Sequence, residues 1–293
     1  MEPAKRQKFR FFAAGFGSTY WLLGSLGCFS AQVFLALVLR GGIQNASATE
    51  PLREISARQV IQLLFKSVRQ GDVDLSGRDL SSMDLSKLDF KSAQLNNANL
   101  FGVDLSEARL RGANLSGASL DRSVITHTDF SGADMTGVSF MRPTVFSSLQ
   151  YDRREAPKFD GAVLKGMRFT GIFDGASFKN ADLTYARMGP HDTRMDISSF
   201  PHNFFRGCDF SNARIIDADL YEASLVMANF AGSDLRGTNF VRADFSSADL
   251  TGADFTGADV TEANFDRAII TGVKGLETAR GFALAVNLDR AIR

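Results

Sequence analysis

An apolar residue recurs at every fifth position through the second half of the chain, and this period constrains the fold more than any other feature. The residue two positions earlier is small, most often Ala, and the residue between them is usually Asp, Asn or Arg. A second series of the same period runs from Leu75 to Phe140. The later apolar series comprises Phe205, Phe210, Ile215, Leu220, Leu225, Phe230, Leu235, Phe240, Phe245, Leu250, Phe255, Val260, Phe265 and Ile270. An internal repeat of this length sets the architecture of the whole chain.

A period of five fits neither a helix nor a continuous strand. Five residues rotate an α-helix by about 500°, so successive apolar residues lie about 140° apart and form no stripe. In a strand, an odd period sends them to opposite faces. Within one unit, however, the small and the apolar residue are two apart and share a face of a short extended segment. The chain must therefore turn after each unit, and four units close a square coil.

Stacked coils of this kind satisfy one another's backbone groups at strand spacing, about 4.8 Å. The apolar and small residues point to the axis, and the Asp or Asn between them points outward. Surface carboxylates in this arrangement are explained by solvation rather than by catalysis. The predicted core comprises Leu100, Leu105, Leu110, Leu115, Phe230, Leu235, Phe240, Phe245, Leu250, Phe255 and Phe265.

The A(D/N)LXX pattern, as in Ala248-Asp249-Leu250, resembles the pentapeptide-repeat family. The resemblance covers Leu75 to Ile270 with two interruptions. It implies an all-β fold, a right-handed quadrilateral β-helix, which is a solenoid. It is specific for the fold and says little about function.

The N-terminal residues 1–48 are typical of an export signal or a membrane anchor. Four basic residues, Lys5, Arg6, Lys8 and Arg10, precede an apolar stretch at residues 11–39. The ending Ala46-Ser47-Ala48 matches a signal-peptide cleavage site, but the stretch is long enough to span a bilayer. Both interpretations predict a periplasmic or other extracytoplasmic location for the rest of a bacterial protein, either secreted after cleavage near Ala48 or anchored in the inner membrane through residues 11–39.

Segments on either side of the repeats are predicted to close its ends. Residues 49–72 favour one N-terminal capping helix, with a capping box at Ser56 and Gln59. Its apolar stripe, predicted to cover the open end of the coils, comprises Val60, Ile61, Leu64, Phe65 and Val68. The β-helix is assigned to residues 73–274 and a C-terminal helical cap to 275–293. The cap offers Leu276, Ala279, Leu284, Val286 and Leu288 for burial and is also a candidate homodimer contact.

Two insertions and one missing residue interrupt the repeat, and they are the places where function is expected. Residues 141–158 and 189–204 are predicted to be loops, and a nine-residue step predicts a bulge near residues 171–175. Loops on a rigid scaffold commonly carry recognition, and aromatic and arginine side chains anchor interfaces. The candidates for partner binding are Phe146, Tyr151, Arg153 and Arg154, although a loop folded back on the coils would also explain them.

The second insertion holds a weak candidate for a metal site. Its residues His191, Asp192, Asp196 and His202 are ligand types, but no established ligand motif is present. No catalytic residue and no cofactor are predicted, because nucleophile and phosphate-loop motifs are absent from the sequence. Cys208 takes a small inward position before Phe210 and is predicted to be a buried free thiol.

Three functions remain in view at this point. The first is a non-enzymatic exported scaffold that binds a protein through its loops, its partner unidentified. The second is what the resemblance implies for acidic members: a DNA mimic that occupies topoisomerases, as in quinolone resistance. The third is a metal-binding or enzymatic role for residues 189–204. Residues 205–270 carry eleven acidic and five basic side chains, so no nucleic-acid partner is expected.

Overall fold

The computed structural model describes residues 53–147, 152–189 and 203–293. The chain divides into two compact units, residues 1–50 and 51–293, and all of the described residues belong to the second. The predicted export segment, Tyr151 and the four candidate metal ligands lie outside the described residues. Among the described residues, no helix is long and apolar enough to cross a membrane.

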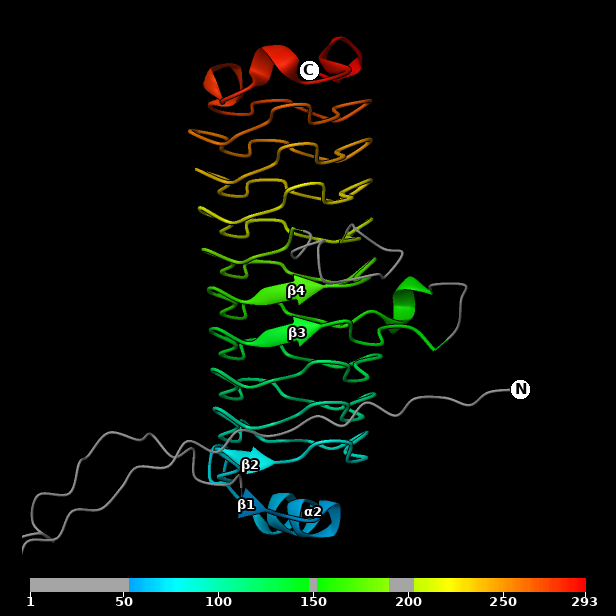
Figure 1. Cartoon of the computed structure of the whole chain (residues 1–293), viewed down its shortest axis with the longest axis vertical. Coiled ribbons are helices and arrows are strands. Elements are labelled where there is room, and N and C mark those ends of the chain that lie inside the picture. The colour runs from blue at the N-terminus through cyan, green and yellow to red at the C-terminus, as the bar shows by residue number, and fades with distance from the viewer. Residues whose placement is uncertain (1–52, 148–151, 190–202) are drawn as a thin grey trace, which may run out of the picture. The chain divides into compact units, whose positions relative to one another are not determined.

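The second unit is a β-helix of stacked coils (Figure 1). Four short strands are parallel partners from neighbouring coils: β1 (Arg53–Glu54) pairs with β2 (Arg78–Asp79), and β3 (Ser139–Met141) with β4 (Arg168–Thr170). Elsewhere each side of a coil contributes a single parallel bridge, twenty residues from its partner in the regular parts, as in Asp249 with Asn229. Each extended segment is this short because the chain turns again after five residues.

The four sides of the column can be named by the outward residues of one coil. Lys158 pairs with Ser177, Val163 with Asp182, Arg168 with Arg187, and Ile172 with Phe204. The large and small inward positions between these residues fill the axis, and every predicted core residue is fully buried. The five-residue period of the sequence therefore predicts the core correctly.

Outward aspartates are not merely solvated, because they build the corners. The carboxylate of Asp249 accepts hydrogen bonds from the backbone N–H of Thr251 (2.9 Å) and from its hydroxyl (2.5 Å). Asp254 and Thr256 repeat this arrangement. The residue after the threonine of each such pair, for example Gly252, adopts a left-handed backbone conformation, which glycine tolerates without strain. The Asp in each unit is thus a turn-forming residue.

The stack of coils also has an aromatic spine. Phe130, Phe159, Phe178, Phe210 and Phe230 lie in successive coils, with ring centroids 4.7–5.2 Å apart and nearly parallel planes. This spine runs through the levels of both insertions and of the missing residue. The axis therefore stays in register even where the perimeter changes.

The N-terminal helix is shorter than predicted and buries less of its stripe. Helix α2 spans Ala57–Lys66, and its capping box at Ser56 is confirmed, with the Ser56 N–H donating to Gln59 Oε1 at 2.8 Å. It ends before Gly71 because Ser67 is extended and Lys91 Nζ donates to the carbonyls of Leu64 (2.9 Å) and Ser67 (2.8 Å). Residues 53–54 form β1 instead of helix.

Only two residues of the predicted stripe are covered. Val60 and Leu64 are buried in the core, whereas Ile61, Phe65 and Val68 are 43%, 87% and 94% exposed. The prediction that all five cover the open end was wrong for these three. The column covers only the centre of the helix's apolar arc, and Leu63 on the other flank is also 43% exposed.

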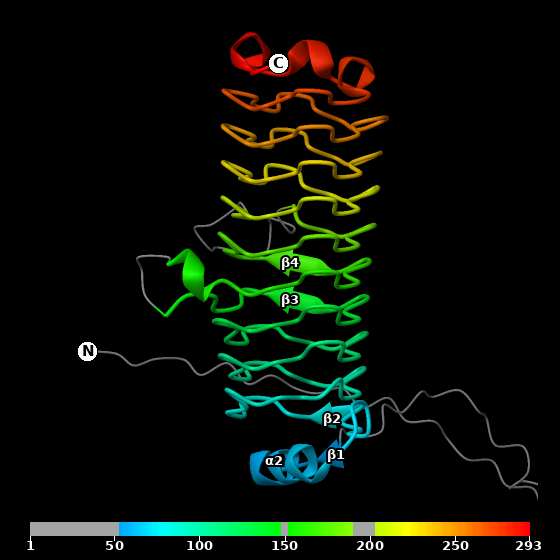
Figure 2. The same cartoon turned by 180° about the vertical axis from the view of Figure 1, so that it is seen from behind.

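The C-terminal segment contains three 3₁₀ turns rather than one regular helix. They are η2 (Leu276–Thr278), η3 (Phe282–Leu284) and η4 (Leu288–Arg290), and they lie at the end of the column opposite α2 (Figure 1, and Figure 2 from behind). A left-handed residue precedes each turn: Gly275, Gly281 and Asn287. Each unit is therefore six residues long. The sequence separation between bridged residues increases by one with each unit, from Asp259 with Arg280 to Ile269 with Ile292.

The six-residue units bury less than expected at this end. Leu276 and Ala279 are buried, but Leu284 and Val286 are 62% and 47% exposed. Val286 takes an outward position, in register with Asn264, and Leu284 ends the turn η3. The expectation of burial was wrong for these two side chains.

The aromatic spine makes a quantitative prediction. Replacing Phe210 by Ala removes a fully buried ring between Phe178 and Phe230 and is expected to cost about 3–5 kcal/mol of unfolding free energy. Phe101→Ala is the control, because this corner ring is 43% exposed and its loss should cost under about 1 kcal/mol. Chemical denaturation followed by circular dichroism measures both, and equal costs would contradict a continuous spine.

Candidate functional site

The first insertion leaves the column at one corner and returns to it nine residues later than the repeat requires. Asp129 pairs with Lys158, 29 residues on instead of 20. The coil itself persists through Val145, which is buried, and resumes at Ala156. The predicted loop 141–158 was therefore too long at both ends, because residues 141–145 and 156–158 still satisfy backbone groups of the column.

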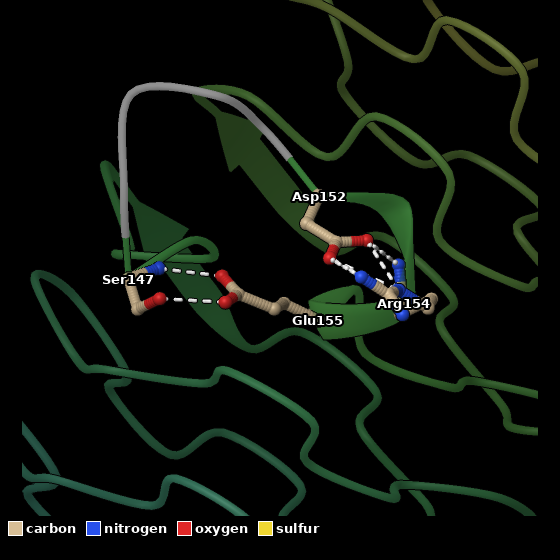
Figure 3. Close-up of polar contacts among 4 residues, drawn as sticks. All are labelled: Ser147, Asp152, Arg154 and Glu155. Atoms are coloured by element: carbon tan, nitrogen blue, oxygen red, sulfur yellow. Dashed lines mark hydrogen bonds and ion pairs between the residues drawn. The ribbon is translucent and has the colours of Figure 1, made fainter.

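Short polar contacts close the base of this excursion (Figure 3). The Glu155 carboxylate accepts from the Ser147 N–H (2.7 Å) and hydroxyl (2.6 Å), which joins the two sides of residues 148–151. These hydrogen bonds lower the pKa of Glu155. Arg154 donates to Asp152 through its backbone N–H and its guanidinium, and this lowers the pKa of Asp152 to about 2. The turn η1 (Arg153–Glu155) is thus fixed in the described structure.

Arg153 and Arg154 take different positions. The guanidinium of Arg154 is 88% exposed beside Asp152. The side chain of Arg153 instead lies against the corner glycines Gly175 and Gly207, where a Cβ at either position would overlap it. Phe146 packs partly against the core. Of the predicted partner-binding residues, the structure therefore offers Arg154 to solvent and uses Arg153 to fasten the loop to the column.

The missing residue falls at Gly171, within the predicted bulge, and a side chain from the second insertion fills the gap. Gly171 has φ of 144° and donates its N–H to Asn203 Oδ1 at 2.7 Å. The Asn203 amide nitrogen donates to the carbonyls of Phe169 (3.2 Å) and Met188 (2.6 Å). Asn203 is 1% exposed, so these contacts replace backbone pairing that the shortened coil cannot make.

The next corner carries an ion pair whose carboxylate is buried and whose guanidinium is partly exposed. Asp174 is 4% exposed and accepts from the Arg206 backbone N–H (2.8 Å) and from Arg206 Nε (2.8 Å) and Nη2 (2.5 Å). The Arg206 guanidinium also lies over the Phe204 ring, 5.2 Å from its centroid. Beneath them, Cys208 is confirmed as a buried free thiol, which donates to the Phe173 carbonyl (3.1 Å). Burial raises the pKa of this thiol well above its usual value.

All three departures from the repeat therefore meet on one side of the column. The outward residues there are Thr144, Ile172 and Phe204, and Arg153 adds the first loop to the corner of the same side. We call this surface the interruption face; it comprises these outward residues with residues 152–155, 174–175 and 206–207. Sequence reasoning found the departures separately but missed Asn203, Asp174 and Arg206. An Asn in a small inward position, two residues before Phe205, was the available signal.

The described residues contain no cluster of three or more His, Cys, Asp or Glu side chains placed to hold a metal ion. Outward carboxylates on successive coils are engaged in other contacts. Asp234 and Asp254 pair in register, and Asp219 and Asp259 are two coils apart with Asn239 between them. Asn239 donates to Asp219 at 2.9 Å, and Arg236 lowers the pKa of Asp234.

Comparison with known proteins agrees with this geometry. A family model described as pentapeptide repeats matches residues 71–106, 104–140 and 228–267. A solved pentapeptide repeat protein from the Arabidopsis thaliana thylakoid lumen is 30% identical, over 42% of this chain and 70% of its own, with a TM-score of 0.24. This chain belongs to the pentapeptide-repeat family. The stacked coils described above are the product of these repeats.

Two further solved structures are similar to this pentapeptide-repeat protein at lower identity. HetL from Nostoc sp. strain PCC 7120, involved in heterocyst differentiation regulation, is 21% identical over 77% of this chain and 94% of its own, with a TM-score of 0.36. QnrB1, a plasmid-mediated fluoroquinolone resistance protein, is 17% identical over 76% and 97%, with a TM-score of 0.34. A comparison with curated proteins gives no match.

A pair of glycine substitutions tests how the loop is fastened. Gly207→Ala and Gly252→Ala place a Cβ on left-handed residues, each costing about 1–2 kcal/mol of stability. Only Gly207→Ala also displaces Arg153, since no atom lies near a Cβ at Gly252. Trypsin should therefore cleave after Arg153 or Arg154 several-fold faster in Gly207→Ala than in Gly252→Ala. Equal cleavage rates would show that Arg153 does not hold the loop.

Proposed function

We propose that this pentapeptide-repeat protein is a non-enzymatic, exported scaffold that binds a protein partner through the interruption face. The observation that carries the proposal is the meeting of three departures on one side, while the rest of the column keeps its repeat. A rigid scaffold that presents the turn η1 beside partly exposed apolar residues has the elements of a recognition surface. The partly exposed Ile172 and Phe204 supply the apolar part, and Arg154, whose side chain is 88% exposed, supplies a positive charge.

Charge favours an acidic partner surface. Residues 141–188 carry eight basic and five acidic side chains, in contrast to the acidic residues 205–270. On the neighbouring side, Arg168 and Arg187 pair in register, which places like charges on adjacent strands. Asp219, in register with Arg187 on the following coil, offsets part of this positive charge, whereas Arg168 has no such acidic partner in register among the described residues. Complementary charge mainly speeds association and selects the partner.

We do not extend the proposal to DNA mimicry. Carboxylates of the acidic run such as Asp249, Asp254 and Asp259 accept hydrogen bonds within their own corners. Their spacing therefore serves the repeat, and the net basic middle interrupts any continuous acidic surface.

A loop deletion tests the proposed binding surface without damaging the column. Removing residues 147–155 restores a five-residue step from Val145 to Phe159, so the coil should close normally. A photo-crosslinking amino acid at Arg154 is expected to capture a partner in the source cells. A crosslinker at Arg236, on regular coils, is the control for chance contact.

Two results would decide the matter. The Arg154 crosslink should be competed away by excess unlabelled full chain and not by the chain lacking residues 147–155. Competition of equal strength by the shortened chain, with its circular dichroism unchanged, would reject the loop as part of the binding surface.

We also infer that the C-terminal end of the column pairs with a second copy of the chain. Leu284, Val286 and Ile292 are all about half exposed or more, and a hollow at the same end is lined in part by Leu276, Phe282 and Leu288. Exposed apolar side chains gathered at one end of a protein favour an interaction there. Exported location and pairing at this end are both parts of the proposal.

Sedimentation of the detergent-solubilised chain tests the pairing. The wild-type chain should sediment as a dimer of its 31.9 kDa protomer, and Leu284→Glu should shift it to the monomer, because a charge cannot be buried unpaired. Met227→Glu is the control, since this residue is 53% exposed on a side of the column. A dimer that survives Leu284→Glu would place the contact elsewhere.

A further inference from the structure

Helix α2 has more apolar surface than the column covers. Val60 and Leu64 are buried, whereas Ile61 and Phe65 are 43% and 87% exposed. Measured around the helix axis from Val60, Ile61 lies at about 100° and Phe65 at about 140°. Val68, just beyond the helix, is 94% exposed. Isolated exposed apolar residues are ordinary, but Ile61 and Phe65 are one helical turn apart on the same face, and Val68 adds a third exposed apolar side chain directly after the helix. We call Ile61, Phe65 and Val68 the outer patch of α2.

Basic residues accompany the outer patch. Residues 55–71 contain Arg58, Lys66 and Arg69 and no acidic side chain. All three basic residues are exposed. Arg58 lies about 20° around the helix from Phe65, so the charge borders the apolar surface directly. An apolar flank edged by Lys and Arg is typical of helices that lie in a membrane interface, where they meet anionic headgroups.

The same charges argue against protein occupants from this chain. A second copy packed on the outer patch would bring two sets of three basic residues together with no acidic partner. The N-terminal residues 1–10 are themselves basic, with four basic residues and one acidic residue, so their charge does not complement the patch either. An anionic bilayer complements both the apolar and the basic part of the surface.

The chain before α2 brings the helix near a bilayer. Residues 11–39 are an apolar stretch long enough to span a membrane, and the helix begins at Ala57. The residues between them, even fully extended, reach at most about 60 Å. Attachment at that range gives a weak surface contact a high effective concentration.

We propose that α2 lies on the surface of an anionic membrane, with the outer patch among the acyl chains and Arg58, Lys66 and Arg69 on the lipid phosphates. The inference rests on the proposed export in its anchored form, in which residues 11–39 stay in the membrane, and it adds a second contact that holds the N-terminal end of the column at the bilayer. The helix then buries its apolar residues in two environments, with Val60 and Leu64 in the protein and Phe65 in lipid.

Fluorescence of the full chain tests this placement, because Trp21 is the single tryptophan of the sequence. In a Trp21→Phe background, Phe65→Trp places a probe in the outer patch. Tyr185→Trp is the matched control, on an exposed corner in mid-column that is 62% exposed. Each chain is reconstituted into vesicles of phosphatidylcholine and phosphatidylglycerol, with or without brominated acyl chains. The probe at residue 65 should shift to the blue and lose most of its emission to bromine, and the probe at residue 185 should do neither.

The outcomes separate this inference from the membrane attachment itself. Trp21 in the wild-type chain reports whether residues 11–39 enter the bilayer. Quenching of Trp21 without quenching at residue 65 would overturn the surface contact and leave the attachment standing. Quenching of neither would overturn both. A blue shift at residue 65 without bromine quenching would mean that protein covers the patch, which also overturns the proposal.

Discussion

The backbone ladder between coils is the constraint on which the rest of the structure depends. Each coil donates its N–H groups to the next, as Phe130 does to Lys158 (2.7 Å) and Phe178 to Asp209 (2.7 Å). Since buried backbone groups must be paired, extra residues can leave the column only at a corner, and a missing residue must be replaced. Both happen here: the excursion before Glu155 leaves and returns at one corner, and the Asn203 amide replaces the pairing lost at Gly171.

This constraint explains why irregularity and function are expected in the same place. The regular sides use their polar residues to form corners, as Asp249 and Thr251 do, and so leave few groups for recognition. The interruption face instead carries a buried Asp174 carboxylate paired with the partly exposed Arg206, and the turn η1. Such features cost more to build than an Asp turn, because a buried charge must be fully paired. A surface of this kind is the natural place for a binding function.

The period of five was sufficient to predict the core, since an inward position such as Phe245 follows from counting alone. Counting could also have predicted the interruption face, because the coil lengths around Gly171 and Phe204 fix which corners lie together. The exposure of Phe65 could not be predicted, since helix periodicity gives the width of an apolar arc but not how much of it the neighbouring coil covers. The six-residue units after Gly275 are present in the sequence, but Leu, Ala and Arg favour helices, so the local composition predicts a helical cap instead.

The central claim is that one side of the column binds the partner, and a scan of the four sides tests it most directly. Photo-crosslinking residues at Thr144, Lys158, Val163 and Arg168 sample each side at neighbouring levels. The account predicts a partner crosslink at Thr144, with weaker capture at Lys158 and Arg168 on the adjoining sides and none at Val163 on the opposite side. Equal capture at all four positions, or capture strongest at Val163, would contradict it.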